Sequence, residues 1–187
     1  AISDPTKLYD IIEPFGVNEN NSSSGVTEKS KTGSLVSAFC EKYYELTQIP
    51  IVAVSCSKGG TNTAFWIPGG KPLNDAIARY KLAKTWLTDN NYTIRHHFMV
   101  WLQGESDGGQ GVTAAEYETA MSNIVNAMMV EGIEKCFNIR VGNAKGNPTR
   151  HTQIIKAQTI LCKKNKDIIM VCTRPDKAEE DGLMKDE

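Results

Sequence analysis

Two short polar segments of the chain combine residue types that could carry out chemistry. The first has the sequence SKGGTNT over residues 57–63 and follows an apolar run. Its paired glycines, Gly59 and Gly60, allow the backbone to approach a ligand closely and to turn N–H groups toward a developing negative charge. A plain turn is the alternative for this segment taken alone. A phosphate-binding loop is disfavoured, because the Gly-Lys-Ser/Thr order and its spacing are absent.

The second segment has the sequence WLQGESDGG over residues 101–109 and follows another apolar run. It places an amide, two carboxylates and a hydroxyl where a strand is expected to end, and core packing does not require so many polar groups there. A solvated turn is the alternative, since Ser, Asp and Gly favour turns. Taken together, the two segments favour a functional site.

Residues 104–108, with the sequence GESDG, also match the nucleophile elbow of α/β-hydrolases, with Ser106 as the nucleophile. The order of residues along the chain disfavours this interpretation. The elbow fold needs an acid and then a histidine downstream, but the only later histidine is His151, and no Asp lies between Asp107 and His151. The elbow also requires a helix directly after the serine, whereas the glycines that follow are expected to extend the loop.

Apolar periodicity predicts helices that alternate with short apolar strands. Such alternation implies parallel strands covered by helices on both faces, so we predict an α/β fold, a three-layer α/β/α sandwich with a mostly parallel sheet. Ligands bind at the carboxyl ends of the strands in such sheets. The predicted helices cover about residues 34–46, 72–87, 113–132 and 149–164, and the predicted strands cover residues 51–56, 94–102, 136–141 and 167–172.

Composition and charge exclude several classes of partner. The chain has 187 residues, 40% of them hydrophobic, which is enough for one domain with a full core. Its 21 basic and 22 acidic residues give a formal net charge of −1, so nucleic acid is not an expected partner. No apolar run approaches the roughly 18 residues that a membrane span needs, so no membrane partner is expected.

Five cysteines occur without a CxxC pair, and we predict that they are buried free thiols. Free thiols slightly favour a reducing, cytoplasmic location. Secretion stays open, because the chain does not begin like a complete protein.

The sequence SKGGT at residues 57–61, followed by WLQGESD at residues 101–107, resembles the sialate O-acetylesterase and acetyl xylan esterase family of SGNH hydrolases. The likeness spans most of the chain. The resemblance implies a flavodoxin-like sheet. It also implies a serine esterase that removes O-acetyl groups from acetylated sialic acid, xylan or a related glycan through an acyl-enzyme. Such an enzyme is expected to need neither a metal nor an organic cofactor.

In this family, the resemblance implies, a serine nucleophile lies in a Gly-Gln-Ser-Asn segment after the first strand, and an Asp-x-x-His element near the C-terminus supplies acid and base. Neither element is complete in this sequence. We expect residues 1–187 to form a single SGNH-hydrolase-like domain whose first strand and serine lie upstream of Ala1. Asp186 is expected to begin the Asp-x-x-His element, with its histidine beyond Glu187. Asp181 does not fit this element, because residue 184 is Met.

The resemblance also implies roles for residues of the two segments. A backbone N–H of Gly59 or Gly60 and the side-chain amide of Gln103 would stabilise the oxyanion of the reaction. Glu105 or Asp186 would orient and charge-stabilise the histidine. The alternative for Glu105 is a structural carboxylate that binds the Gly-Gly loop.

Three further residues and two other functions stay open. Thr61 and Trp66 are candidates for contact with the sugar, and the alternative for Trp66 is a partly buried aromatic. His151 is an outside candidate for the catalytic base, and a solvated residue at a helix start is the alternative. The chain could instead be a non-catalytic carbohydrate-binding relative or, less favoured, an α/β-hydrolase that uses Ser106.

Overall fold

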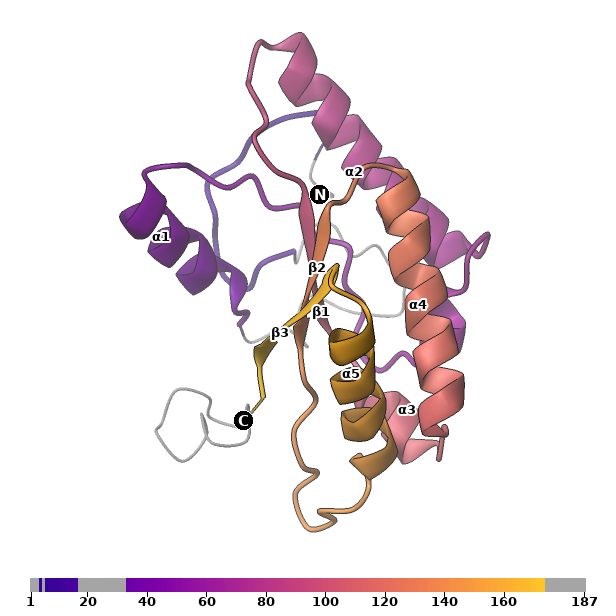
Figure 1. Ribbon diagram of the computed structural model, residues 1–187. Coiled ribbons are helices and arrows are strands. Elements are labelled where there is room, and N and C mark those ends of the chain that lie inside the picture. The colour runs from indigo at the N-terminus through magenta and orange to yellow at the C-terminus, as the bar shows by residue number, and fades with distance from the viewer. Residues whose placement is uncertain (1–3, 5, 17–32, 174–187) are drawn as a thin grey trace. The chain divides into compact units, whose positions relative to one another are not determined.

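The computed structural model describes residues 4, 6–16 and 33–173 (Figure 1). The chain divides into two compact units. The first unit comprises Ala1–Gly59 and Asp75–Ile94, and the second comprises Gly60–Asn74 and Arg95–Glu187. The helix α2, Lys71–Asp89, therefore begins in the second unit and continues in the first. Asp186 lies outside the described residues.

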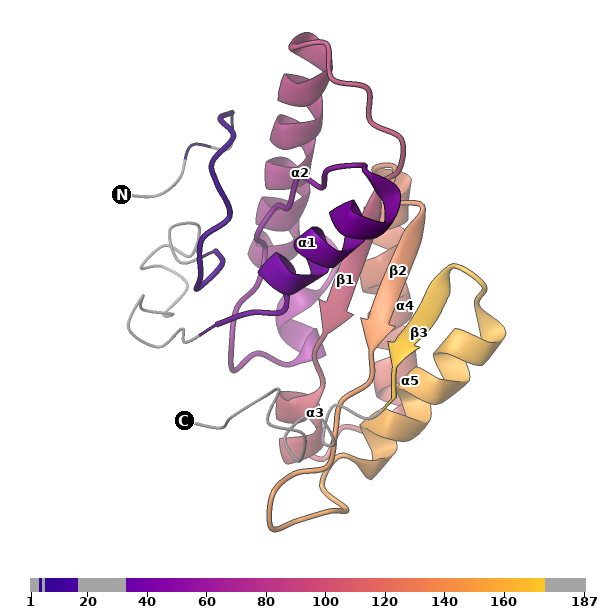
Figure 2. The same cartoon turned by 90° about the vertical axis from the view of Figure 1, so that its left-hand side faces the viewer.

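The second unit contains a parallel sheet with the order β1-β2-β3, in which β1 is Phe98–Leu102, β2 is Lys135–Ile139 and β3 is Ile168–Cys172. The helices α4, Ala114–Val130, and α5, Thr152–Lys164, connect the strands and pack against each other. The arrowheads of the strands point toward a short helix, α3, Glu105–Gly109 (Figure 2). Helices joined to a parallel sheet confirm the predicted α/β fold class.

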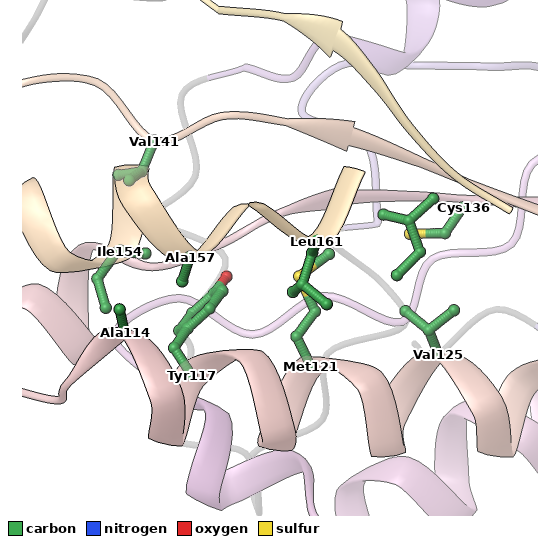
Figure 3. Packing of buried hydrophobic residues seen from close by; sticks show 10 residues of the cluster. Ala114, Tyr117, Met121, Val125, Cys136, Val141, Ile154, Ala157 and Leu161 are labelled. Atoms are coloured by element: carbon green, nitrogen blue, oxygen red, sulfur yellow. The ribbon is translucent and has the colours of Figure 1, made fainter. Parts of the chain in front are cut away.

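The core of the second unit lies between α4, α5 and the sheet. Residues spaced four apart on α4, such as Tyr117, Met121 and Val125, share one face of that helix. They point toward the buried face of α5, which carries Ala157 and Leu161 (Figure 3). The helix α4 begins where the sequence predicts, at a capping box formed by Thr113 and Glu116.

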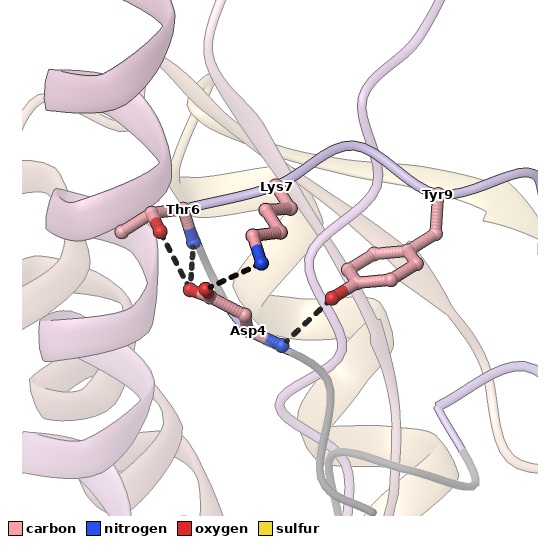
Figure 4. Close-up of polar contacts among 4 residues, drawn as sticks. All are labelled: Asp4, Thr6, Lys7 and Tyr9. Atoms are coloured by element: carbon pink, nitrogen blue, oxygen red, sulfur yellow. Dashed lines mark hydrogen bonds and ion pairs between the residues drawn. The ribbon is translucent and has the colours of Figure 1, made fainter.

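The first unit contains α1, Val36–Thr47, the main part of α2 and the segment 6–16. The carboxylate of Glu13 accepts hydrogen bonds from the hydroxyls of Ser34 and Ser37 and so ties this segment to the start of α1. Asp4 makes only local contacts in Figure 4, all of them with residues within five positions along the chain. No helix in the described part of the chain is long and apolar enough to cross a membrane.

The predicted strand over residues 51–56 is wrong for this structure, because these residues form neither helix nor strand. A strand exists only where its backbone forms a hydrogen-bonded ladder with a neighbouring strand, and within the described part of the chain residues 51–56 pair with none. The strand predicted from residue 94 begins only at Phe98. The loop predicted after Leu102 contains the helix α3.

Candidate active site

Gln103 lies at the carboxyl end of β1, where Gly104 turns the chain sharply into α3. Gly104 has a φ of 142°, a conformation that side chains rarely adopt. A Cβ at this position would also lie 2.6 Å from a methyl carbon of Ile154 on α5. Only glycine fits at position 104, because its backbone lies so close to Ile154. The preceding residue, Gln103, is buried, with 9% of its surface exposed.

Asp107 is fully buried, and its carboxylate connects α3 to the segment after Gly60. It accepts hydrogen bonds from the backbone N–H of Thr63 at 3.1 Å to each oxygen, and from the Thr63 hydroxyl at 2.5 Å. It also accepts a hydrogen bond from the amide Nε2 of Gln103. A second cross-link joins the amide of Asn62 to the side-chain oxygen of Gln110 at 2.6 Å.

The side chain of Gln103 brings the two polar segments of the sequence into contact. Its Nε2 donates to the carbonyl of Thr61 at 3.0 Å as well as to Asp107, so both amide protons have acceptors. Its Oε1 accepts from the hydroxyl of Tyr117 at 3.1 Å. The amide is therefore held at both ends.

Tyr117 and Gln158, which both bind Gln103, are fully buried. Gln158 accepts from the backbone N–H of Val141 at 2.9 Å and donates to the backbone carbonyl of Gln103 at 2.9 Å and to the Tyr117 hydroxyl at 3.0 Å. Burial raises the pKa of Tyr117 well above its ordinary value. Sequence reasoning missed Gln158, although its place on the buried face of a predicted helix was a signal.

Glu105 is exposed at the first position of α3, and Asp107, not Glu105, is the carboxylate that binds the glycine-containing segment. Asp107 therefore has the structural role that we gave as the alternative for Glu105. An exposed carboxylate at this end of the sheet is compatible with the predicted role of Glu105 in orienting a histidine, which stays a prediction. The same role for Asp186 falls outside the described residues.

The glycines of the first segment lie on either side of the boundary between the two units. Gly60, in the second unit, is exposed with a φ of 70° and precedes Thr61, whose carbonyl Gln103 binds. Gly59 is the last residue of this stretch in the first unit. The predicted contribution of Gly59 or Gly60 to an oxyanion hole stays a prediction.

Trp66 lies at the end of a short 3-10 helix, η3, Thr63–Trp66, with 8% of its surface exposed. Its indole N–H donates to the hydroxyl of Thr61 at 3.0 Å, and its ring meets Trp101 edge-on with centroids 6.4 Å apart. The low exposure and these contacts agree with the alternative of a partly buried aromatic. Sugar contact by Thr61 and Trp66 stays a prediction.

Ser106 lies inside α3, so a helix does begin at this point, contrary to our expectation of an extended loop. The strained backbone that an elbow nucleophile requires is absent at Ser106, because among the described residues the only ones with positive φ besides glycines are Gln48 and Asn91. The use of Ser106 as a nucleophile therefore remains the less favoured alternative.

His151 is 5% exposed and precedes the first residue of α5. The expectation of a solvated residue at the helix start is therefore wrong. Its Nδ1 lies 2.8 Å from the carbonyl oxygen of Gly142, which can only accept, so Nδ1 carries the proton. The ring packs directly on Gly108 of α3. This packing explains the burial, since a side chain at position 108 would occupy the same space.

The cysteines and possible metal ligands in the described residues complete the local chemistry. All five cysteines are free, as predicted, but only Cys40 and Cys136 are buried. The described ranges contain no group of three His, Cys, Asp or Glu side chains that could hold a metal ion.

Comparison with known proteins identifies the family to which this arrangement belongs. A family model described as a carbohydrate esterase, sialic acid-specific acetylesterase, matches residues 13–183. A comparison with curated proteins gives no significant match. The matched range covers most of the chain and includes both polar segments that Gln103 joins. The chain therefore belongs to the sialic acid-specific acetylesterase family of carbohydrate esterases.

Proposed function

We propose that this protein removes O-acetyl groups from a carbohydrate through a covalent acyl-enzyme on a serine. The observation that carries the proposal is the 3.0 Å hydrogen bond from the Gln103 amide to the carbonyl of Thr61. This bond places a side-chain amide donor beside the Gly60–Thr61 backbone, at the carboxyl end of β1. Ligands bind at this end of a parallel α/β sheet.

In the proposed reaction, the serine hydroxyl attacks the carbonyl carbon of the acetyl group and a histidine accepts the serine proton. The tetrahedral intermediate collapses, the sugar oxygen leaves, and the histidine returns the proton to it. A water molecule then attacks the acetyl-serine, which releases acetate and restores the serine. We propose that the serine precedes Ala1, that the histidine follows Asp186, and that Glu105 or Asp186 orients the histidine.

The negative charge of the intermediate would be stabilised by a backbone N–H of Gly59 or Gly60 and by the amide of Gln103. Both protons of this amide already have acceptors, Thr61 and Asp107. The proposed role therefore requires the oxyanion to replace or share the bond to the Thr61 carbonyl. Loss of one such donor typically costs about 2.7 to 4 kcal/mol of transition-state stabilisation.

A covalent probe tests the serine mechanism. The full-length natural protein is treated with a fluorophosphonate, which traps activated serines, and the adduct is located by peptide mass spectrometry. An adduct upstream of Ala1 supports the proposal, and heat-denatured protein, which should not react, is the control. An adduct on Ser106 favours the α/β-hydrolase alternative. A folded protein that forms no adduct favours a non-catalytic carbohydrate-binding relative.

The family description supports acetylated sialic acid as the first substrate to test, with acetylated xylan as the second. Release of acetate from each, measured in parallel at equal acetyl concentration, ranks the two substrates. A higher kcat/KM on sialic acid supports the first choice, and a higher value on xylan overturns it.

A further inference from the structure

We propose that Asp107 is a positioning residue that fixes which end of the Gln103 amide faces the site. The inference rests on the proposed function of Gln103 as a donor to the oxyanion. Asp107 is not expected to touch the substrate, because it is fully buried and contacts the site only through Gln103 and Thr63.

The two ends of a glutamine side chain have nearly the same shape, so its hydrogen-bond partners decide its orientation. In this structure Nε2 faces two groups that accept, the Asp107 carboxylate and the Thr61 carbonyl. A rotated amide would place Oε1 against both acceptors. The hydroxyl of Tyr117 at the other end favours the same orientation, because it accepts from Gln158 and directs its own proton toward Oε1. A neutral hydroxyl binds less strongly than a carboxylate, so we assign the larger share of the orientation to Asp107.

The two acceptors differ in how strongly they bind the Gln103 amide protons. A carboxylate accepts a stronger hydrogen bond than a neutral carbonyl, and Asp107 is itself held by the backbone N–H and hydroxyl of Thr63. Thr61, in contrast, is partly exposed. We infer that the Gln103 amide proton bonded to Asp107 stays in place, and that the amide proton bonded to the Thr61 carbonyl is the one that forms a hydrogen bond with the oxyanion.

The substitution Asp107→Asn tests this division directly, because it keeps the shape and replaces one acceptor with a donor. If the Asn oxygen stays on Thr63, its amide nitrogen faces the Gln103 amide nitrogen, and the conflict is relieved when the Gln103 amide rotates. Rotation turns Oε1 toward the oxyanion. We expect kcat to fall by about 100-fold or more and KM to change by less than about threefold.

Gln110→Leu is the matched control. It removes the second side-chain hydrogen bond between the two segments and leaves the bond that Gln103 donates to Asp107 in place. We expect a lower melting temperature for Asp107→Asn, and a kcat within about threefold of the wild type for Gln110→Leu. Equal losses of kcat in the two variants, or a rise in KM at unchanged kcat for Asp107→Asn, would overturn the proposal.

A second measurement does not depend on the folding of a variant. The side-chain amide protons of Gln103 in the wild type are followed by NMR, and are identified by their loss in Gln103→Leu. We expect one proton that exchanges slowly with solvent, bound to Asp107, and one that exchanges faster. Two protons that exchange equally fast would contradict a fixed amide.

Failure of the proposed function gives a different result from failure of this inference. If Gln103→Leu retains full kcat, Gln103 is not an oxyanion donor and the proposed function of this residue fails. If Gln103→Leu loses activity and Asp107→Asn does not, the oxyanion role stands and the positioning role of Asp107 is wrong.

Discussion

The carboxylate of Asp107 binds both the backbone N–H and the hydroxyl of Thr63, a residue 44 positions earlier in the chain. This contact joins the start of η3 to α3. It is connected to the bond between Gln103 and Thr61, because the Gln103 amide also donates to Asp107. One buried carboxylate therefore holds together the two segments that carry the family resemblance.

Replacement of Gln103 is expected to lower catalysis. Gln103→Leu removes the amide donor, so we expect kcat to fall by about 100- to 1000-fold, measured by acetate release at saturating substrate. Gln110→Leu is the matched control, because Gln110 is exposed and its side-chain oxygen binds Asn62, away from the Gln103 amide. Unchanged kcat for Gln103→Leu would show that the oxyanion is stabilised by other groups.

The adjacent glycines of α3 are expected to respond differently to alanine. A Cβ at Gly108 would lie 2.5 Å from the buried ring of His151, so Gly108→Ala should lower the free energy of unfolding by about 1 to 3 kcal/mol. A Cβ at Gly109 would meet the guanidinium of Arg150, which is exposed and free to swing aside. Gly109→Ala should therefore be nearly neutral or slightly stabilising, because alanine favours helix by up to about 1 kcal/mol.

Urea unfolding of both variants, compared with the wild type, checks this pair. Similar losses at the two positions would mean that the ring of His151 yields as easily as the arginine side chain.

Alkaline pH is expected to destabilise the fold through Tyr117. Burial raises its pKa above the unfolded value of about 10. Its contribution to stability is complete below about pH 10. Above this pH the unfolded chain loses the proton while the folded chain keeps it, so the free energy of unfolding falls until the folded pKa is reached.

Tyr117→Phe removes this titration. We expect its stability between about pH 10 and 11.5 to fall less steeply than that of the wild type, by up to about 1.4 kcal/mol per pH unit. Tyr44→Phe, which alters an exposed tyrosine, should retain the wild-type slope. Parallel curves for Tyr117→Phe and the wild type would refute the assignment.

The thiol of Cys136 is expected to resist alkylation in the folded protein. Burial, with the nearby thiol of Cys162, raises the pKa of Cys136 to about 12, and the thiolate is the reactive form. Iodoacetamide at pH 8, followed by peptide mass spectrometry, should label Cys136 only after urea is added. Cys172, which is half-buried, is the internal control. Equal labelling of the two residues without urea would contradict the burial of Cys136.

Sequence patterns predicted the regular elements of the second unit well. The helix predicted over residues 113–132 corresponds to α4, which begins after the cap Thr113 and buries Tyr117 and Met121. Local signals of this kind act over a few residues, so a single sequence contains them. The strand over residues 51–56 failed because a strand is defined by its neighbour, which periodicity does not supply.

The polar network was harder to predict. The motif marked Gln103, but nothing in its neighbourhood distinguished Asp107 as the buried carboxylate from Glu105 as the exposed one. That choice depends on the partner Thr63, 44 residues away. Gln158 and Tyr117 likewise become polar partners of Gln103 only after α4 and α5 have packed.

Release of acetate from O-acetylated sialic acid by the full-length protein tests the central claim most directly. Free acetate and deacetylated sugar are both quantified, with acetylated xylan in a parallel reaction. We predict equimolar acetate and free sugar hydroxyl from at least one of these substrates, at a rate that depends on Gln103. A folded protein that releases no acetate from either carbohydrate would contradict it.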